Sequence, residues 1–124
     1  MVGLGLKAIE HGHRVYFLTL HDLVTKARKA RVKNWLDSLL GTLMRNDLLI
    51  LDEVMAGFGR TGAWFAFDHY DVRPDLITFA KGVNSGYVPL GAMIWNRKIW
   101  EYFQENPFTG GLTYCGHALA CAAG

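Results

Sequence analysis

The segment that decides the fold is Asp47 to Val54, which reads DLLILDEV. Its apolar residues follow one another without alternation, and two acidic residues, Asp52 and Glu53, come at the end of the run. Strands that are covered on both faces have this pattern, and they are typical of parallel sheets. We therefore expect a buried parallel strand whose end carries carboxylates, as at the ligand-binding edge of α/β sheets.

Strand-like and helix-like segments alternate on both sides of this run. We expect further strands at 14–20 (RVYFLTL), 76–80 and 90–95, because these stretches are short and rich in β-branched or aromatic residues. We expect helices at 4–10, 22–31, 34–44, 97–104 and 117–123. The aromatic segment 64–70 is ambiguous between helix and strand. The alternation predicts an α/β layer architecture.

Composition limits the chain to one small globular unit. Its 124 residues are 51% hydrophobic and 19% charged, as in folded rather than disordered chains. The formal net charge of +2 is too small to indicate a nucleic-acid partner. The charge is uneven, however, because residues 1–50 carry eight Lys and Arg against four Asp and Glu, whereas residues 51–124 carry five against seven. Such an asymmetry suggests two parts of different origin.

Signals for secretion, membrane insertion and metal binding are weak. We expect neither a signal peptide nor a membrane span, since the charges of Lys7 and Glu10 interrupt the first apolar stretch. No disulfide framework surrounds Cys115 and Cys121, so we expect reduced thiols and a cytoplasmic protein. The histidines lack the paired spacing of metal ligands, and we expect no metal site.

Three polar residues form a candidate cofactor site. Asp52 ends the first strand described above, and Lys81 directly follows the expected strand 76–80. Thr113 lies in the glycine-rich stretch GGLTYCG (110–116). A lysine amine can form a Schiff base with the aldehyde of pyridoxal phosphate (PLP). A carboxylate can keep the pyridine nitrogen protonated, and a hydroxyl can bond a phosphate oxygen. The combination favours PLP chemistry.

These residues also have plainer interpretations. Asp52 could be a solvated acid at a sheet edge, and Lys81 an ordinary surface lysine. Thr113 could cap the helix that follows it, which is compatible with phosphate binding because helix N-termini favour anions. Arg60, in the turn-rich loop GFGRTG, could bind an anion or be a structural loop arginine. The aromatic residues of segment 64–70 are expected in the core rather than at a cofactor.

From about residue 51 to residue 124 the chain closely resembles the class III (omega) aminotransferases, a fold-type I PLP family. The matching stretches are DEVMAGFGRTGAWFAFDHY (52–70), PDLITFAKGVNSGYVPLGAMI (74–94) and FTGGLTYCGHALACAAG (108–124). The resemblance implies that Lys81 is the Schiff-base lysine, that Asp52 pairs with the pyridine nitrogen and that Val54 packs against the ring. It further implies a homodimer, in which Thr113 reaches the phosphate in the neighbouring subunit's site.

The same resemblance implies an activity and a missing part. The activity is the transfer of an amino group from an amine or ω-amino acid to a keto acid. Cys115 and Ala118 stand where the family often has Ser and Pro. The family's phosphate loop and ring-stacking aromatic would lie before Asp52, and its small C-terminal domain after Gly124. We therefore expect a fragment of the large domain, and whether it is an active enzyme stays open.

From Met1 to about Ile50 the chain resembles a different family, the IstB-like helper ATPases of transposition. In that family LLILDE is the Walker B strand, which implies that Asp52 faces Mg²⁺ and Glu53 the attacking water. The phosphate loop GxxxxGK[ST] would precede this segment and is absent. The expected fold is thus an α/β fragment of a fold-type I PLP-dependent transferase (51–124) preceded by a partial P-loop-ATPase-like α/β segment (1–50). An inactive chimeric reading frame is a further hypothesis.

Overall fold

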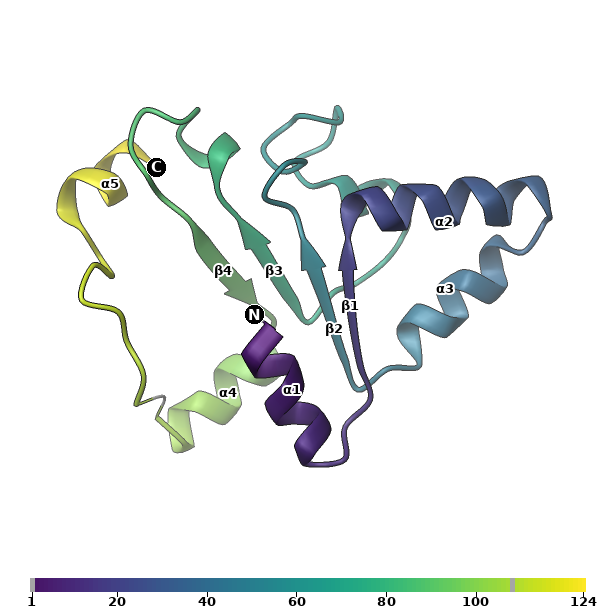
Figure 1. Cartoon of the computed structure of the whole chain (residues 1–124), viewed down its shortest axis with the longest axis horizontal. Coiled ribbons are helices and arrows are strands. Elements are labelled where there is room, and N and C mark those ends of the chain that lie inside the picture. The colour runs from purple at the N-terminus through teal and green to yellow at the C-terminus, as the bar shows by residue number, and fades with distance from the viewer. Residues whose placement is uncertain (1, 108) are drawn as a thin grey trace.

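Four apolar stretches form one mixed sheet in the computed structural model, which describes residues 2–107 and 109–124. Within these residues the strands are, in spatial order, β1 (Val15–Thr19), β2 (Leu48–Asp52), β3 (Leu76–Phe79) and β4 (Ala92–Trp95). The first three strands run parallel, and β4 pairs antiparallel with β3 (Figure 1). The α/β architecture predicted from the alternation of segments is confirmed.

Helices connect these strands and cover the sheet. In the described part of the chain they are α1 (Val2–Glu10), α2 (Leu20–Val32), α3 (Leu36–Met44), α4 (Arg97–Glu105) and α5 (Ala118–Ala123), with two 3₁₀ turns, η1 (Ala66–His69) and η2 (Lys81–Val83). Each expected helix is present, with shifted ends. Helix α2 begins earlier than expected because the Thr19 hydroxyl accepts a hydrogen bond from the Asp22 N–H at 3.2 Å and caps the helix.

Strand β2 is at the centre of the parallel part of the sheet. Its residues 49–51 are at most 2% exposed, and it pairs in parallel with β1 on one side and β3 on the other. This confirms the buried parallel strand predicted from DLLILDEV. The strand ends at Asp52, however, and Glu53 and Val54 belong to the turn that follows it.

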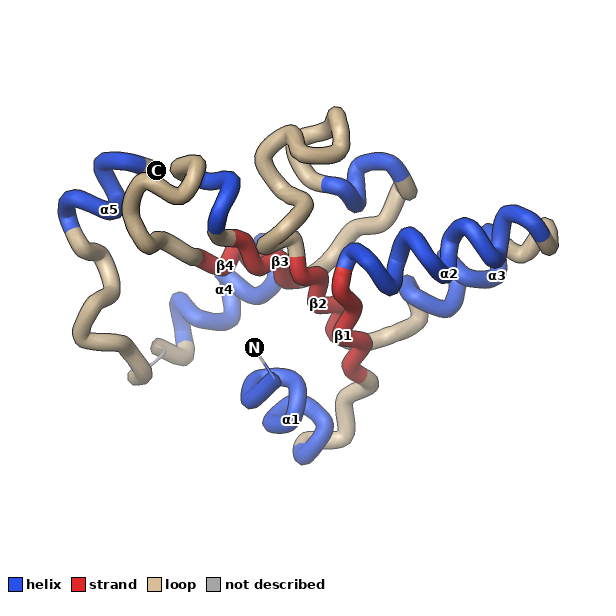
Figure 2. The backbone as a smooth tube through the Cα atoms, turned by 45° about the horizontal axis from the view of Figure 1, so that its top comes forward, coloured by secondary structure: helices blue, strands red, loops and turns tan. Residues whose placement is uncertain are grey.

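The main core lies between one face of the sheet and helices α2 and α3. Its buried cluster consists of Leu18, Leu23, Leu43, Leu49, Leu51 and Val72. Helices α1 and α4 lie on the opposite side of the sheet (Figure 2). There, Phe103 of α4 packs on Trp95 of β4 with a ring-centroid distance of 5.6 Å. The sheet is therefore layered between helices, as α/β folds require.

The edge strand β4 is the least protected part of the sheet. The predicted strand 90–95 begins only at Ala92, and all of its residues are exposed. An apolar edge strand presents unpaired backbone groups to other chains, and association through β4 is the expected consequence. The loop predicted over 106–111 includes Phe108, which lies outside the described residues.

The aromatic segment 64–70 is neither a regular helix nor a strand. It forms the 3₁₀ turn η1, which follows an extended residue, Phe65. Trp64 is 73% exposed, so its predicted place in the core is wrong. Phe65 and Phe67 are partly buried and stack with a centroid distance of 5.7 Å. Trp64 lies before this turn and is exposed, whereas Phe65 and Phe67 are partly buried.

Candidate functional site

The carboxyl ends of β2 and β3 lie at the same edge of the sheet. The two strands are parallel neighbours, and Asp52 at the end of β2 pairs with Thr78 of β3. Lys81 follows β3 and opens the turn η2. The structure therefore brings Asp52 and Lys81 to one edge, where the ligands of open α/β sheets bind (Figure 1).

Asp52 is half-buried, and its carboxylate shapes the turn after β2. Its Oδ1 atom accepts a hydrogen bond from the Val54 N–H at 2.9 Å. Such a bond from an aspartate to the backbone two residues later turns the chain sharply. Val54 is also half-buried and lies beside the carboxylate. A carboxylate held in this way can accept a further hydrogen bond from a ligand N–H.

Lys81 has an unusual backbone conformation. Its φ angle is +39°, in the left-handed region that residues other than glycine rarely adopt. A conformation of this kind costs about 1–3 kcal/mol and is concentrated at functional sites. The side chain is exposed, and its Nζ atom lies 2.7 Å from the Met55 Sδ atom. The amine is thus directed toward the loop that follows Asp52.

Gly82 allows this loop to approach Lys81 closely. A Cβ atom on Gly82 would lie 3.0 Å from the carbonyl oxygen of Gly57 and 3.1 Å from the Phe58 Cβ atom. The Phe58 ring packs edge-on against Phe79 of β3 with a centroid distance of 5.2 Å. The loop after β2 and the lysine turn after β3 therefore form one packed unit.

Glu53 is a residue whose role the sequence did not reveal. Its side chain is 1% exposed, and its two carboxylate oxygens accept hydrogen bonds from the Ala66 and Phe67 N–H groups at 3.2 and 3.1 Å. Burial raises the pKa of Glu53, and these two bonds oppose the rise. The available signal was an acidic residue directly after a buried strand, but this does not distinguish a solvated from a buried carboxylate.

Thr113 does not join Asp52 and Lys81. It lies in the turn 113–116, is exposed and belongs to the segment that runs beyond the β4 edge (Figure 2). The alternative interpretation of Thr113, as the cap of the following helix, is wrong, because His117 caps α5 by accepting a hydrogen bond from the Ala120 N–H at 3.4 Å. Within the described residues, no hydrogen bond links Thr113 to Asp52 or Lys81.

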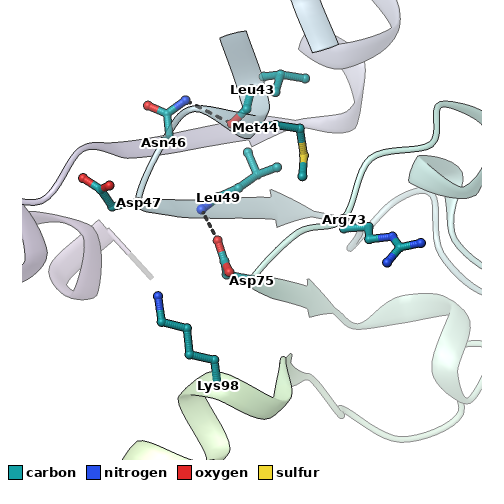
Figure 3. Close-up of a pocket in the computed structure, with 8 residues that line it drawn as sticks. All are labelled: Leu43, Met44, Asn46, Asp47, Leu49, Arg73, Asp75 and Lys98. Atoms are coloured by element: carbon teal, nitrogen blue, oxygen red, sulfur yellow. Dashed lines mark hydrogen bonds between the residues drawn. The ribbon is translucent and has the colours of Figure 1, made fainter. Parts of the chain in front are cut away.

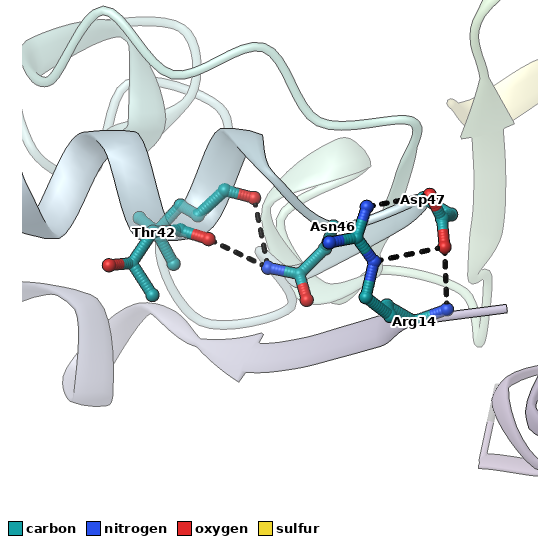
Figure 4. A network of polar contacts seen from close by, with 5 residues as sticks. Arg14, Thr42, Asn46 and Asp47 are labelled. Carbon is teal, nitrogen blue, oxygen red and sulfur yellow. Dashed lines mark hydrogen bonds and ion pairs between the residues drawn. The ribbon is translucent and has the colours of Figure 1, made fainter.

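A cavity of about 270 Å³ lies at the opposite edge of the sheet, near the amino end of β2 (Figure 3). Asp75, in its wall, accepts a hydrogen bond from the Leu49 N–H at 2.8 Å. Nearby, Asp47 accepts hydrogen bonds from Arg14, which lower its pKa from the usual 3.8 to about 2 (Figure 4). These carboxylates are engaged within the protein, and the cavity lining includes neither Asp52 nor Lys81.

A second hollow, of about 440 Å³, lies between α2 and α3. It is lined by exposed lysines and by Trp35, over whose ring the Lys33 Nζ atom lies at 5.0 Å from the centroid. It too is separate from Asp52 and Lys81. Among the described residues, no group of His, Cys, Asp and Glu could hold a metal ion, and no helix is long and apolar enough to cross a bilayer.

Asp52 and Lys81, at the ends of neighbouring parallel strands, have the arrangement expected for a PLP-dependent α/β transferase. The profile of the class-III aminotransferase family matches residues 33–124, which are most of the chain. The chain belongs to this family. The match begins at residue 33, inside the segment 1–50 that resembles the ATPases. The expected boundary at residue 51 falls within β2, which pairs with β1 along its length.

Individual relatives agree with this assignment. Diaminobutyrate--2-oxoglutarate transaminase of Halomonas elongata is 48% identical over an alignment of 94 residues, and the match covers 71% of this chain and 20% of that protein. Omega-amino acid--pyruvate aminotransferase of Pseudomonas putida is 45% identical over 86 residues, 64% of this chain and 19% of that protein. The chain thus spans about a fifth of the length of these curated relatives.

Solved structures resemble the chain over a similar extent. The taurine:2-oxoglutarate aminotransferase of Bifidobacterium kashiwanohense, in complex with PLP and glutamate, superposes with a TM-score of 0.66 and 50% identity, covering 72% of this chain and 20% of that one. An (S)-enantioselective omega-transaminase of Thermomicrobium roseum gives a TM-score of 0.65 and 46% identity, covering 72% and 21%. Over the superposed part, the chain therefore has the fold of about a fifth of each of these enzymes.

Proposed function

We propose that this chain carries the cofactor-attachment segment of a PLP-dependent class III transaminase. The observation that carries the proposal is the placement of Asp52 and Lys81 at the ends of two neighbouring parallel strands. The left-handed backbone of Lys81 and the close approach at Gly82 support it, because they hold the amine toward the loop after β2. Membership of the family supplies the chemical context.

The residues present fit part of a PLP site. When bound, PLP would supply an electron sink for bonds at the carbon that bears the substrate amine. Lys81 Nζ would attach the aldehyde carbon and, once released, carry a proton. The Asp52 carboxylate would accept the hydrogen bond of the pyridinium N–H, and Val54 would pack against the ring. Thr113, which lies apart from them in this chain, would bind phosphate in a neighbouring subunit.

The reaction that we propose for the intact protein is amino-group transfer from an amine or ω-amino acid to a keto acid. Relatives named for ω-amino acid and diaminobutyrate substrates support this substrate class. A homodimer follows from the proposed place of Thr113. Small molecules rather than nucleic acid are the proposed partners. The free thiols of Cys115 and Cys121 support a reducing, cytoplasmic compartment.

The test is a titration of the chain with PLP, followed by borohydride reduction and mapping of the modified lysines by mass spectrometry. Lys81→Ala removes the proposed attachment point, and Lys98→Ala, on the surface of α4, is the matched control. Saturable absorbance that maps to Lys81, persists in Lys98→Ala and vanishes in Lys81→Ala supports the proposal. Non-saturating labelling spread over many lysines contradicts it and favours the inactive chimeric reading frame.

The resemblance of residues 1–50 to transposition ATPases is a separate proposal. What supports it is the order of a strand, a basic helix and a second helix before the acidic strand end, with exposed Lys and Arg along α2. In this alternative Asp52 and Glu53 would serve a bound nucleotide. Binding of MgATP, measured by calorimetry and weakened by Asp52→Asn, would support it, and no heat of binding would contradict it.

A further inference from the structure

Glu53 occupies a position from which its side chain can control the site without touching a ligand. It directly follows Asp52, yet its carboxylate turns inward and is almost fully buried. Each carboxylate oxygen accepts one backbone N–H, from Ala66 and from Phe67. These bonds join the beginning of the loop after β2 to its end, so we define residues 53–67 as the Glu53 loop.

The Glu53 loop is closed by several contacts that depend on its two ends being held together. The Phe58 N–H donates to the Trp64 carbonyl oxygen at 2.6 Å, across the loop. The Phe65 ring, adjacent to the residues that Glu53 binds, packs against Phe58 at a centroid distance of 5.6 Å. A Cβ atom on Gly57 would lie 3.2 Å from that same Phe65 ring. The Glu53 carboxylate thus fixes where Gly57 and Phe58 lie.

The closed loop in turn contacts the lysine turn at two places, and strand β3 at a third. The Gly57 carbonyl and Phe58 abut Gly82, where a Cβ atom would lie 3.0 and 3.1 Å away. Met55 places its sulfur 2.7 Å from the Lys81 Nζ atom. The Glu53 N–H donates to the Thr78 carbonyl of β3 at 2.8 Å. The left-handed conformation of Lys81 needs this kind of surrounding support, because strained conformations persist only where neighbours hold them.

We propose that Glu53 is a positioning residue for Lys81: its buried carboxylate closes the loop 53–67 against the lysine turn and so fixes the direction of the amine. This inference rests on the proposed function, in which Lys81 is the attachment point for PLP. The two backbone N–H groups that bind Glu53 require a side chain with two equivalent acceptor oxygens. An amide has one oxygen, so Glu53→Gln leaves one backbone N–H facing an NH₂ group.

The experiment compares Glu53→Gln with the matched control Asp68→Asn. Asp68 lies in the turn η1, together with Ala66 and Phe67. It accepts a hydrogen bond from the Phe65 N–H at 3.1 Å, but its side chain is exposed. Two readouts are taken on the full chain. One is the ratio of borohydride-trapped PLP at Lys81 to that at Lys26, an exposed lysine of α2. The other is amide hydrogen exchange at residues 66–67 and 81–83.

We expect Glu53→Gln to lower the labelling ratio about tenfold, which corresponds to ~1.4 kcal/mol, and to speed exchange at both segments. Asp68→Asn should leave the ratio and exchange at 81–83 unchanged. A purely structural glutamate would speed exchange at 66–67 alone and keep the ratio, and that result overturns the inference. If Glu53→Gln does not fold, Glu53→Asp, which keeps both oxygens but shortens the side chain, is judged by the same readouts.

Failure of the proposed function is recognised separately. In that case the unmodified chain shows no preference of PLP for Lys81 over Lys26. Exchange at 81–83 then decides the positioning role alone. Faster exchange there in Glu53→Gln but not in Asp68→Asn supports it, and equal exchange in the two variants overturns it.

Discussion

The close approach of the loop after β2 to the lysine turn predicts that Gly82→Ala destabilises the fold. A Cβ atom at this position would meet a backbone carbonyl oxygen at 3.0 Å and the Phe58 Cβ atom at 3.1 Å. Neither atom lies at the end of a flexible side chain, so the loop itself must move. Overpacking of this kind costs about 1–3 kcal/mol. We therefore expect Gly82→Ala to lower the free energy of unfolding by that amount.

Gly41 provides the matched control, because it allows the same substitution without a clash. It lies inside α3, and no heavy atom would come within 4 Å of an added Cβ atom. Alanine is favoured over glycine in a helix interior by about 1 kcal/mol. Gly41→Ala should therefore stabilise the chain. The two substitutions are chemically identical, and the structure predicts opposite signs for them.

Equilibrium unfolding in urea, followed by the fluorescence of the four tryptophans, measures both effects. With an m value of about 1–3 kcal/mol/M for a small protein, the Gly82→Ala midpoint should fall by roughly 1 M. The midpoint of Gly41→Ala should rise. An unchanged or raised midpoint for Gly82→Ala would show that the loop does not pack on the lysine turn, and the argument for a single packed unit would fail with it.

Three further outcomes follow from the contacts described above. Leu43→Ala, in the core, should cost about 2–5 kcal/mol in urea unfolding, because Leu43 is fully buried. Asn96→Ala should cost about 0.5–2 kcal/mol, since the Asn96 side chain caps α4 by accepting from the Ile99 N–H. The lowered pKa of Asp47 means that its pairing with Arg14 stabilises the fold above pH 3.8 and is lost as the pH falls toward 2. Asp47→Asn should therefore flatten the acid limb of a stability–pH curve, and an unaltered limb would contradict this.

The strands were predictable because each is a short apolar run bounded by polar or turn residues. DLLILDEV has no alternation, and that alone indicated burial on both faces and parallel neighbours. The position of Asp52 followed, because a residue at the end of such a strand must lie at the carboxyl edge. Lys81 followed from the same reasoning applied to β3. The sequence of apolar runs therefore predicted the edge of the sheet at which Asp52 and Lys81 lie.

The conformation of the loops could not be predicted from sequence patterns. Segment 64–70 was ambiguous because a 3₁₀ turn has no periodicity that differs from a short helix or strand. The burial of Glu53 depends on N–H groups that lie far along the chain, at Ala66 and Phe67. Two adjacent acids at a strand end look alike in the sequence, although Asp52 is half-buried at the sheet edge and Glu53 is almost fully buried.

Thr113 shows a different limit. Its segment also resembles the family, yet the fold leaves it beyond β4 and away from Asp52. A short sequence pattern predicts the local structure of a residue. It predicts the position of that residue in the fold only where the pattern also implies which strand or helix the residue packs against. No strand of the described sheet includes the segment 109–117. In the proposed function, Thr113 would act through contacts with a neighbouring subunit.

The placement of Asp52 and Lys81 at one edge of the sheet depends finally on the opposite edge. Asp75 directly precedes β3 there: its carboxylate accepts from the N–H of Leu49 in β2 at 2.8 Å, and from the side chain of Asn96, which follows β4, at 2.6 Å. These bonds fix the register of β2 and β3 where the strands begin. A slip of one residue would turn Asp52 to the other face of the sheet. The register set at Asp75 therefore helps to bring a carboxylate and a lysine to the same edge, where the strands end.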